Sequence, residues 1–298
     1  MDGIIVINKP KGITSHDVVY KVKKIFNEKV GHTGTLDPNA TGVLPLLIGQ
    51  GTKLSKYLIE HDKIYKVRLT LGKKTDSADV EGNVIEERDV DEKSLNTQNI
   101  KNVLNSFIGK SKQIPPMYSA IKVKGKKLYE YARKGQTVDI EPREIEIFGI
   151  NLINIENLSI DFTVHCSKGT YIRSLCEDIA KKLGTIGYME ELERLKVGNF
   201  CINDSITIEE LDVNKANSEF FNKHFITFEK HFENINKIIL NDKKLSLFLN
   251  GVNLLVDLAD GIYKVYNNCN FIGIGTVKNN LLKRDIILKW ILLLYHNF

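Results

Sequence analysis

Residues 31–46 read GHTGTLDPNATGVLPL, and this stretch holds a single carboxylate, Asp37, inside a turn rich in glycine and proline. Its three glycines allow the backbone to approach a ligand closely. Pro38 biases Asp37 toward an extended conformation. The apolar run 43–48 that follows predicts a buried element. A lone acid held rigidly beside the core is a candidate catalytic group, but Asp-Pro is also typical of an ordinary turn, so spacing alone leaves both interpretations open.

The composition is that of a globular protein with a mildly basic surface. The chain has 298 residues, of which 42% are hydrophobic and 27% charged, and its formal net charge is +5. This length is enough for one large domain or for a large domain with a small one. Residues 121–135 hold six lysines and arginines against one glutamate, with Tyr118, Tyr129 and Tyr131 interspersed. This patch predicts neutralisation of an RNA backbone with base stacking, although a solvated helix face would look similar.

Cysteine usage and the chain ends indicate a cytoplasmic protein. The four cysteines form no Cys-x-x-Cys pair, and no histidine cluster has the spacing of a metal site, so we expect free thiols and no metal. The N-terminus has no signal-peptide pattern. The apolar tail 286–295 is interrupted by Lys289 and is shorter than the roughly 20 residues of a membrane span. We therefore expect a buried element there and no contact with a membrane.

Periodicity predicts an α/β (α+β) chain followed by a small β domain. Residues 203–236 are polar and weakly periodic, which indicates a helical and irregular connection. From 237 onward, short strands separated by turns such as Asp260-Gly261 predict a small β-barrel. Before the connection we expect strands near 4–8, 64–72, 143–153 and 158–166, helices over 15–26, 52–60, 92–108 and 171–180, and a polar acidic loop at 73–84.

Common catalytic motifs are absent from the sequence. It contains no Walker loop, dinucleotide fingerprint, zinc spacing or nucleophile elbow. The other candidates are Tyr65, Arg173 and the turn Lys9-Pro10-Lys11-Gly12, which are equally explained as a half-buried strand tyrosine, a surface arginine and a solvated turn. Arg173 falls in the first turn of a predicted helix, where the helix dipole disfavours a cation. A carboxylate partner would explain its position.

Several blocks of the sequence, taken in order, resemble the TruB family of bacterial tRNA pseudouridine synthases. The resemblance is strong over 1–200 and thinner over 203–298, where that family carries a small RNA-binding domain of PUA type. It departs at 192–195, which read LERL where the family often has Leu-Arg-Arg, so no RNA contact is transferred to Glu193. The matching blocks are NKPKGITS (8–15), GHTGTLDP (31–38), TGVLP (41–45), KIY (63–65), GKKTDSAD (72–79), PMYSAIK (116–122), GKKLYEYAR (125–133) and CSKGTYIR (166–173).

The resemblance implies a fold and an activity. The fold is a pseudouridine synthase domain over 1–235, with a central mixed, mainly antiparallel sheet and an RNA-binding flap at 113–141, and a PUA-like barrel over 236–298. The activity is isomerisation of the T-loop uridine of tRNA, position 55, to pseudouridine by base flipping, without cofactor, metal or protein partner, by a monomer. Two alternatives are a tRNA-folding chaperone without catalysis and the catalytic subunit of a guide-RNA complex.

The resemblance also implies roles for three catalytic residues. Asp37 matches the essential aspartate, which either attacks the uracil or sugar or stabilises a glycal-type intermediate. Arg173 matches the arginine that pairs with this aspartate and favours its charged form. Tyr65 matches the tyrosine that stacks on the target base and can act in proton transfer.

Four further residues are expected to bind the RNA substrate. His32 matches the histidine that enters the T-loop and occupies the space of the flipped nucleotides. Tyr171 and Leu192 match residues that line the uracil site. Lys9 and the segment 113–135 match RNA-contacting elements.

Overall fold

The computed structural model describes residues 2–58, 61–123 and 125–288, and its centre is a ten-stranded mixed sheet. The strands follow the order β14-β1-β3-β12-β4-β11-β10-β7, with β2 paired to β3 and β13 to β12. Within the described part of this sheet, only the pairing of β12 with β3 is parallel, which confirms the expected mainly antiparallel sheet. The strands are β1 (Gly3–Lys9), β2 (Val30–His32), β3 (Thr41–Ile48), β4 (Lys63–Leu71), β7 (Gly109–Gln113), β10 (Arg143–Glu156), β11 (Ser159–Cys166), β12 (Gly187–Val197), β13 (Phe200–Cys201) and β14 (Phe225–Thr227).

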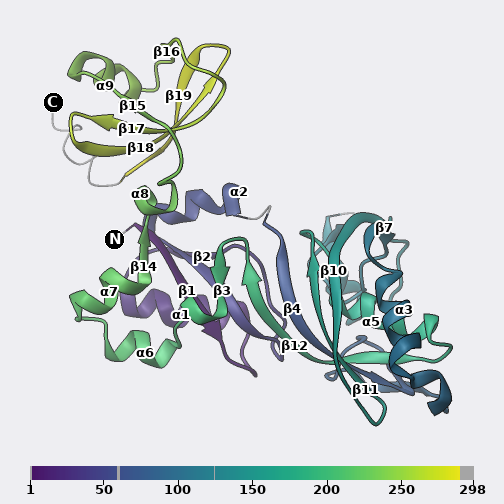
Figure 1. Cartoon of the computed structure of the whole chain (residues 1–298). Coiled ribbons are helices and arrows are strands. Elements are labelled where there is room, and N and C mark those ends of the chain that lie inside the picture. Colours follow the sequence, from purple (N-terminus) through teal and green to yellow (C-terminus); the bar gives the residue numbers. More distant parts are fainter. Residues whose placement is uncertain (1, 59–60, 124, 289–298) are drawn as a thin grey trace.

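The two halves of this sheet are buried differently, as their sequence patterns require. The continuous apolar run of β1 packs Ile5 and Ile7 against α1 (Ser15–Phe26) and α6 (Ile208–Val213), and turns Ile4 and Val6 into a second core on the other face. The alternating pattern of β4 buries one face only. That face is covered by α3 (Thr97–Asn105) and α5 (Ile172–Lys182), which lie together at one end of the molecule in Figure 1.

Helix α1 begins and ends where its sequence predicts. Thr14 is the N-cap, because its hydroxyl accepts from the Asp17 amide at 3.0 Å while Asp17 accepts from the Thr14 amide at 2.9 Å. The helix stops at Asn27, which adopts the left-handed conformation at φ 50°. Local sequence therefore determines both ends of this helix, which packs beside the first strands of the sheet.

Three expected elements differ from the observed ones. The expected acidic loop at 73–84 contains a hairpin, β5 (Lys73–Thr75) and β6 (Val84–Glu87), closed by Asp76 accepting from the Asn83 amide at 3.0 Å. The expected helix 92–108 is a 3-10 turn, η2 (Glu92–Leu95), followed by α3, because Asn96 caps a new helix. The expected helix 52–60 is η1 (Gly49–Leu54) and α2 (Ser55–Leu58), and residues 59–60 lie outside the described part.

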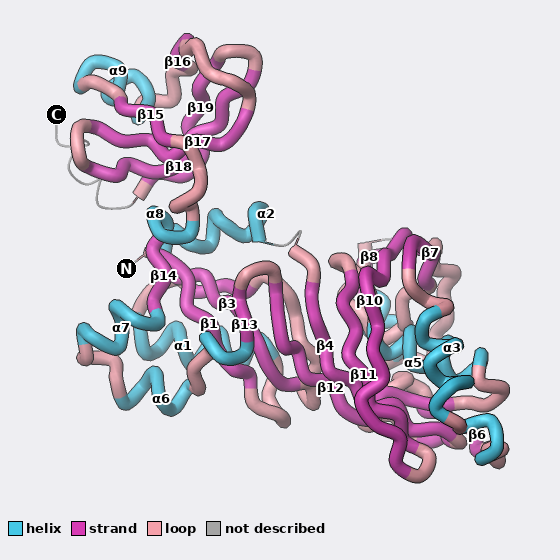
Figure 2. The backbone as a smooth tube through the Cα atoms, viewed as in Figure 1, coloured by secondary structure: helices cyan, strands magenta, loops and turns pink. Residues whose placement is uncertain are grey.

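The connecting segment is mostly helical and irregular, as expected, but it also contains the edge strand β14, which pairs with β1. It leads to a second, curled sheet. It contains η3 (Ile202–Asp204), α6, α7 (Ser218–His224) and α8 (Phe228–His231). The second sheet has five strands in the order β15-β17-β18-β19-β16 and forms a half-barrel at one end of the molecule (Figure 2). Its strands are β15 (Lys237–Ile239), β16 (Leu254–Leu255), β17 (Gly261–Asn267), β18 (Asn270–Lys278) and β19 (Leu281–Ile287), with the helix α9 (Asp242–Leu249) beside them.

The second sheet packs on the first through a shared apolar core. Val265 and Ile274 of the half-barrel belong to the same buried cluster as Val6 of β1 and Phe228 of α8. Of the apolar tail 286–295, the first residues are buried at the end of β19, and residues 289–298 lie outside the described part. Among the residues the structure describes, none of the helices is long and apolar enough to cross a membrane.

Candidate active site

Asp37 lies in the loop between β2 and β3, and buried side chains hold the backbone on both sides of it. The Ser15 hydroxyl donates to the Leu36 carbonyl at 3.1 Å and accepts from the Leu36 amide at 2.9 Å. The Lys9 ammonium donates to the Pro38 carbonyl at 2.9 Å. Helix α1 and strand β1 thus fix the residues before and after Asp37, which positions its carboxylate without restraining it directly.

Lys9 is buried behind the loop that carries Asp37 and is not a surface cation. Its side chain is fully buried, and its Nζ donates to the carbonyls of Pro10 and Pro38, both at 2.9 Å. Burial lowers the pKa of Lys9 to about 8, and the charges of Asp37 and Glu81 oppose this shift. The expected contact of Lys9 with an RNA phosphate is not supported by this geometry, because both acceptors are protein carbonyls and the ammonium has no open side.

Arg173 joins the catalytic loop to a second carboxylate. Its Nε lies 3.3 Å from Oδ2 of Asp37, and its Nη1 lies 3.4 Å from Oδ2 of Asp79. Its Nη2 donates to the carbonyl of Tyr118 at 2.8 Å. The carboxylate partner that the helix position of Arg173 called for is therefore present, and there are two of them. Asp79 was missed as a site residue, although it closes the matching block 72–79.

The Asp37 carboxylate is partly open to the cavity but lies in a poorly hydrated environment. Its side chain is 35% exposed, against 7% for Arg173. Burial raises the pKa of Asp37, and the nearby charge of Asp79 adds to the rise, while Arg173 and Lys9 oppose it. Arg173 thus acts in the expected direction, but desolvation outweighs it.

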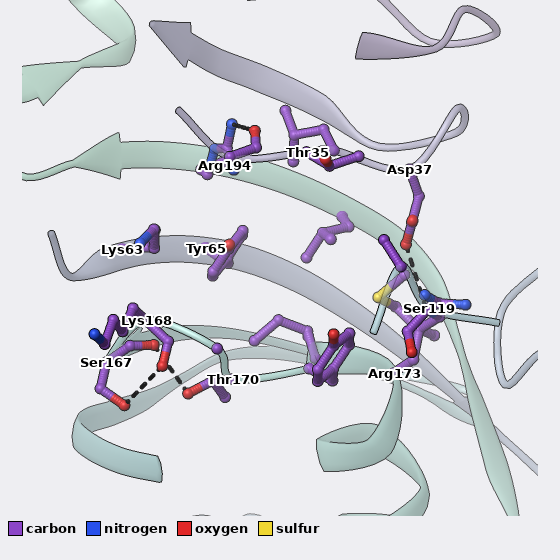
Figure 3. A pocket seen from close by; sticks show the side chains of 18 of the residues that line it. Thr35, Asp37, Lys63, Tyr65, Ser119, Ser167, Lys168, Thr170, Arg173 and Arg194 are labelled. Carbon is purple, nitrogen blue, oxygen red and sulfur yellow. Dashed lines mark hydrogen bonds and ion pairs between the residues drawn. The ribbon is translucent and has the colours of Figure 1, made fainter. Parts of the chain in front are cut away.

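One cavity of about 740 Å³ collects five of the seven expected site residues: Asp37, Tyr65, Tyr171, Arg173 and Leu192 all line it. Its volume lies in the range of roughly 300–1,000 Å³ usual for small-molecule sites. In Figure 3, Asp37 and Arg173 lie at one end, while Lys63, Ser167 and Lys168 lie at the other. Tyr65 is only 8% exposed, and burial raises its pKa. The cavity therefore offers an acid and an arginine at one end and cations at the other.

The segment 113–141 closes one side of this cavity. The Gln113 side chain donates to the Tyr171 carbonyl at 3.0 Å and accepts from the Tyr171 amide at 2.8 Å, and the Ser174 hydroxyl donates to the Ile114 carbonyl at 3.1 Å. Tyr118, Ser119, Ala120 and Tyr129 line the cavity. The segment contains β8 (Lys122–Val123), β9 (Lys126–Lys127) and α4 (Leu128–Ala132).

The basic patch of this segment lies on the protein surface. Lys122, Lys126, Arg133 and Lys134 are exposed, and Lys124 lies outside the described residues. The Arg133 guanidinium lies 5.3 Å from the centre of the Tyr129 ring. Cations are thus placed beside the ring of Tyr129, which itself lines the cavity, and this arrangement suits a nucleic acid.

Comparison with known proteins identifies the family. The model described as "TruB family pseudouridylate synthase (N terminal domain)" matches residues 23–172, and "tRNA pseudouridylate synthase B C-terminal domain" matches 173–230. The "tRNA pseudouridine synthase B" of Clostridium kluyveri is 46% identical over 94% of this chain and 96% of its own length. That of Caldanaerobacter subterraneus subsp. tengcongensis is 42% identical over 95% and 98%. The chain belongs to the TruB family of pseudouridylate synthases.

Solved structures show where this TruB-family fold recurs. The chain is similar to a protein in the crystal structure of a Cbf5-Nop10-Gar1 complex, with 26% identity, a TM-score of 0.68, and coverage of 96% of this chain and 83% of that one. It is also similar to one in an archaeal box H/ACA sRNP Nop10-Cbf5 complex, with 23% identity, a TM-score of 0.67, and coverage of 96% and 85%. The second likeness concerns the fold alone.

The two other expected residues of the TruB-family site lie beside the cavity rather than in its wall. Lys9 lies behind the catalytic loop. His32 is half-buried at the end of β2, where burial and the nearby charge of Arg194 lower its pKa. Its Nδ1 is buried and has no hydrogen-bond partner among the described residues. His32 is therefore not among the residues that line this cavity, although its neighbour Thr33 is.

A second residue that sequence reasoning missed is Arg194, which also lines the cavity. It lies in the run 192–195, where only the departure from the family pattern was considered. Within the described residues, no group of three or more histidine, cysteine, aspartate or glutamate side chains could hold a metal ion.

Proposed function

We propose that this pseudouridylate synthase converts uridine 55 in the T-loop of tRNA to pseudouridine, with Asp37 as the essential group. The observation that carries this proposal is the convergence of Asp37, Tyr65 and Arg173 on one cavity, whose other lining residues include polar, aromatic and aliphatic side chains. Relatives named tRNA pseudouridine synthase B, at 42–46% identity over most of both chains, support tRNA as the substrate.

The target uridine must leave the stack before it can react. The N1, C5 and C1′ atoms are inaccessible in a folded loop, so the nucleotide is extruded into the cavity at a cost of a few kcal/mol. Stacking on the Tyr65 ring, worth about 1–3 kcal/mol, offsets part of this cost. Tyr171 and Leu192 line the same cavity and would confine the base as it turns.

The isomerisation exchanges one bond for another at the same carbon. The C1′–N1 bond breaks, the uracil rotates, C5 bonds to C1′, and the proton on C5 is lost while N1 gains one. Asp37 serves either as the nucleophile or as the group that stabilises a glycal-type intermediate, and both roles require its ionised form. Arg173, 3.3 Å away, holds this carboxylate in place and favours its charge against the effect of burial.

Two parts of the chain would hold the rest of the tRNA. We assign residues 1–235 to the catalytic domain, with 113–141 as an RNA-binding flap, and residues 236–298 to a PUA-like RNA-binding domain. Exposed Lys122, Lys126 and Arg133 would neutralise backbone phosphates of the T-arm. His32, at the edge of the site, would enter the T-loop when the nucleotides flip. We propose that a monomer acts in the cytoplasm, where its substrate is found.

The two alternatives are less well supported. A tRNA chaperone without catalysis has no need for an arginine that pairs with two carboxylates, one of them on a loop that lines a cavity. A catalytic subunit of a guide-RNA complex would agree with the fold likeness at 23–26% identity. The sequence likeness to tRNA pseudouridine synthase B is much greater, at up to 46%.

The test is direct. The purified chain is incubated with a T-arm minihelix and no additive, and pseudouridine is mapped by mass spectrometry, with Asp37→Asn as the matched control. We expect product at the T-loop uridine with the wild-type chain and none with the variant, which still binds the RNA. Product from the Asp37→Asn protein would remove the catalytic assignment, and activity that required an added guide RNA would favour the guide-RNA alternative.

A further inference from the structure

Arg194 is a buried cation for which the proposed mechanism has no role so far. It lies on β12, is 2% exposed, and ranks among the largest fully buried side chains of the described residues. Its Nε donates to the Val43 carbonyl at 2.7 Å and its Nη2 to the Gly34 carbonyl at 3.1 Å. Within the described part of the chain, no carboxylate forms an ion pair with it. A buried guanidinium without a carboxylate partner is costly and calls for an explanation.

The register of the sheet places Arg194 next to Tyr65. In the pairing of β12 with β4, Arg194 lies directly opposite Tyr65, and both side chains line the same wall of the cavity. Figure 3 shows the two side chains on neighbouring strands beside the catalytic loop. The Arg194 charge and its hydrogen bond with the phenol oppose the rise that burial causes in the pKa of Tyr65.

Two glycines lie close to Arg194, one beside its backbone and one beside its guanidinium. Gly42 of β3 pairs with it in the parallel register and has φ +103°, and a Cβ there would lie 2.3 Å from the Arg194 carbonyl oxygen. At Gly34, a Cβ would lie 3.6 Å from the guanidinium. Two of the glycines of the stretch 31–46 therefore border this one arginine. Its hydrogen bonds join β3 to the loop that carries Asp37, and the strand register places it opposite Tyr65.

We propose that Arg194 is a positioning residue for the isomerisation, which holds the Tyr65 hydroxyl and the Gly34 end of the catalytic loop in one arrangement. The site then contains two buried arginines with separate tasks. Arg173 orients Asp37 through an ion pair, and Arg194 orients Tyr65 without a competing carboxylate. This inference rests on the proposed function, since it concerns the same reaction.

A double-mutant cycle tests the proposal. Arg194→Met, Tyr65→Phe and the double variant are compared in single-turnover pseudouridine formation on the T-arm minihelix, alongside RNA binding and thermal unfolding. We expect Arg194→Met to lower the rate by at least about tenfold, with RNA affinity changed by less than about threefold. In the Tyr65→Phe background the same change should add less than about twofold, because the hydroxyl it positions is gone.

Two more variants keep the test decisive. Arg194→Lys retains the charge and part of the hydrogen bonding, so it should recover part of the rate; if Arg194→Met does not fold, the cycle is run with this variant. Arg68→Met is the matched control, because Arg68 lies on β4 outside the cavity and pairs with Asp161 at 2.7 Å. Equal losses in the wild-type and Tyr65→Phe backgrounds would overturn the inference. A wild-type chain that forms no pseudouridine would instead overturn the proposed function.

Discussion

The loop that carries Asp37 and the flap at 113–141 face the same cavity but are held in opposite ways. The loop is fixed from behind by buried Lys9, Ser15 and Arg194, whose polar atoms bond its carbonyls and amides. The flap is attached at its first residues by bonds to the start of α5, and residues 133–137 farther along are exposed. The part that carries the reacting group is preorganised, while the part that would grip the RNA faces solvent.

The charged groups of the two regions also differ in their exposure to water: those around the loop are largely buried, and those of the flap are exposed. Around the loop, Lys9, Asp37, Asp79 and Arg173 interact at low hydration, so their effects depend on pH and change little with salt. The flap offers exposed cations, whose attraction to a polyanion weakens as salt rises. Disturbing each region should therefore produce a different experimental signature.

The largest effect is expected from removing the loop's own acid. Asp37→Asn should lower single-turnover pseudouridine formation by at least about 10⁴-fold, because it removes the group on which either chemical role depends. Affinity for tRNA should change little. Because burial raises the pKa of Asp37, the ionised acid costs stability at neutral pH, and the variant should unfold at an equal or higher temperature. A clearly lower unfolding temperature would instead make Asp37 a structural residue.

The ion-pair network behind Asp37 should show the next largest effect. Arg173→Lys keeps the charge but cannot reach Asp37, Asp79 and the Tyr118 carbonyl together, so the rate should fall about 10²-fold. Asp79→Asn should cost about tenfold, since Arg173 then loses one anchor. Rates are measured under single-turnover conditions with saturating enzyme. An Asp79→Asn protein with the wild-type rate would show that Arg173 needs only Asp37 and the flap.

The buried Lys9 predicts a stability difference that depends on pH. Its pKa is lowered from 10.5 in the unfolded chain to about 8 in the folded one, so between these values the unfolded state binds more protons. The contribution of Lys9 to the free energy of unfolding therefore rises with pH from about 8 to 10.5 and is constant below 8. Relative to Lys9→Met, the wild-type chain should gain about 3 kcal/mol across this window, measured by urea unfolding. If the free energies of unfolding of the wild-type chain and of Lys9→Met changed in parallel with pH, Lys9 would be hydrated in solution.

The smallest effect is expected from the flap. Replacing Lys122 and Lys126 by alanine should weaken tRNA binding about tenfold at moderate salt and reduce the slope of log affinity against log salt by about one per lost phosphate contact. The rate at saturating enzyme should not change. The control is Lys101→Ala on α3, away from the cavity, which should leave the slope intact. A changed rate at saturating enzyme would mean that the flap affects the isomerisation step as well as RNA binding.

Local sequence predicts most of the scaffold. Apolar alternation predicts β4, the Thr14–Asp17 pair predicts the start of α1, and turns that contain Asn268, Asn279 and Asn280 in the left-handed conformation separate the long strands of the half-barrel. Where the apolar pattern fails to predict a helix boundary, a short-range polar contact sets it. Asn96 is an example, because it caps a new helix inside the expected one. The hairpin β5–β6 was missed because its strands are short and exposed, with no apolar alternation to reveal them.

The sequence by itself determined the family, the mixed sheet with its small second domain, and Asp37, Tyr65 and Arg173 as the residues of interest. Only the tertiary structure decided that Lys9 lies behind the catalytic loop, that Asp79 shares Arg173 with Asp37, and that Arg194 faces Tyr65. The reason is that hydration and charge interactions depend on distance through space. Strand register, rather than spacing along the chain, sets those distances.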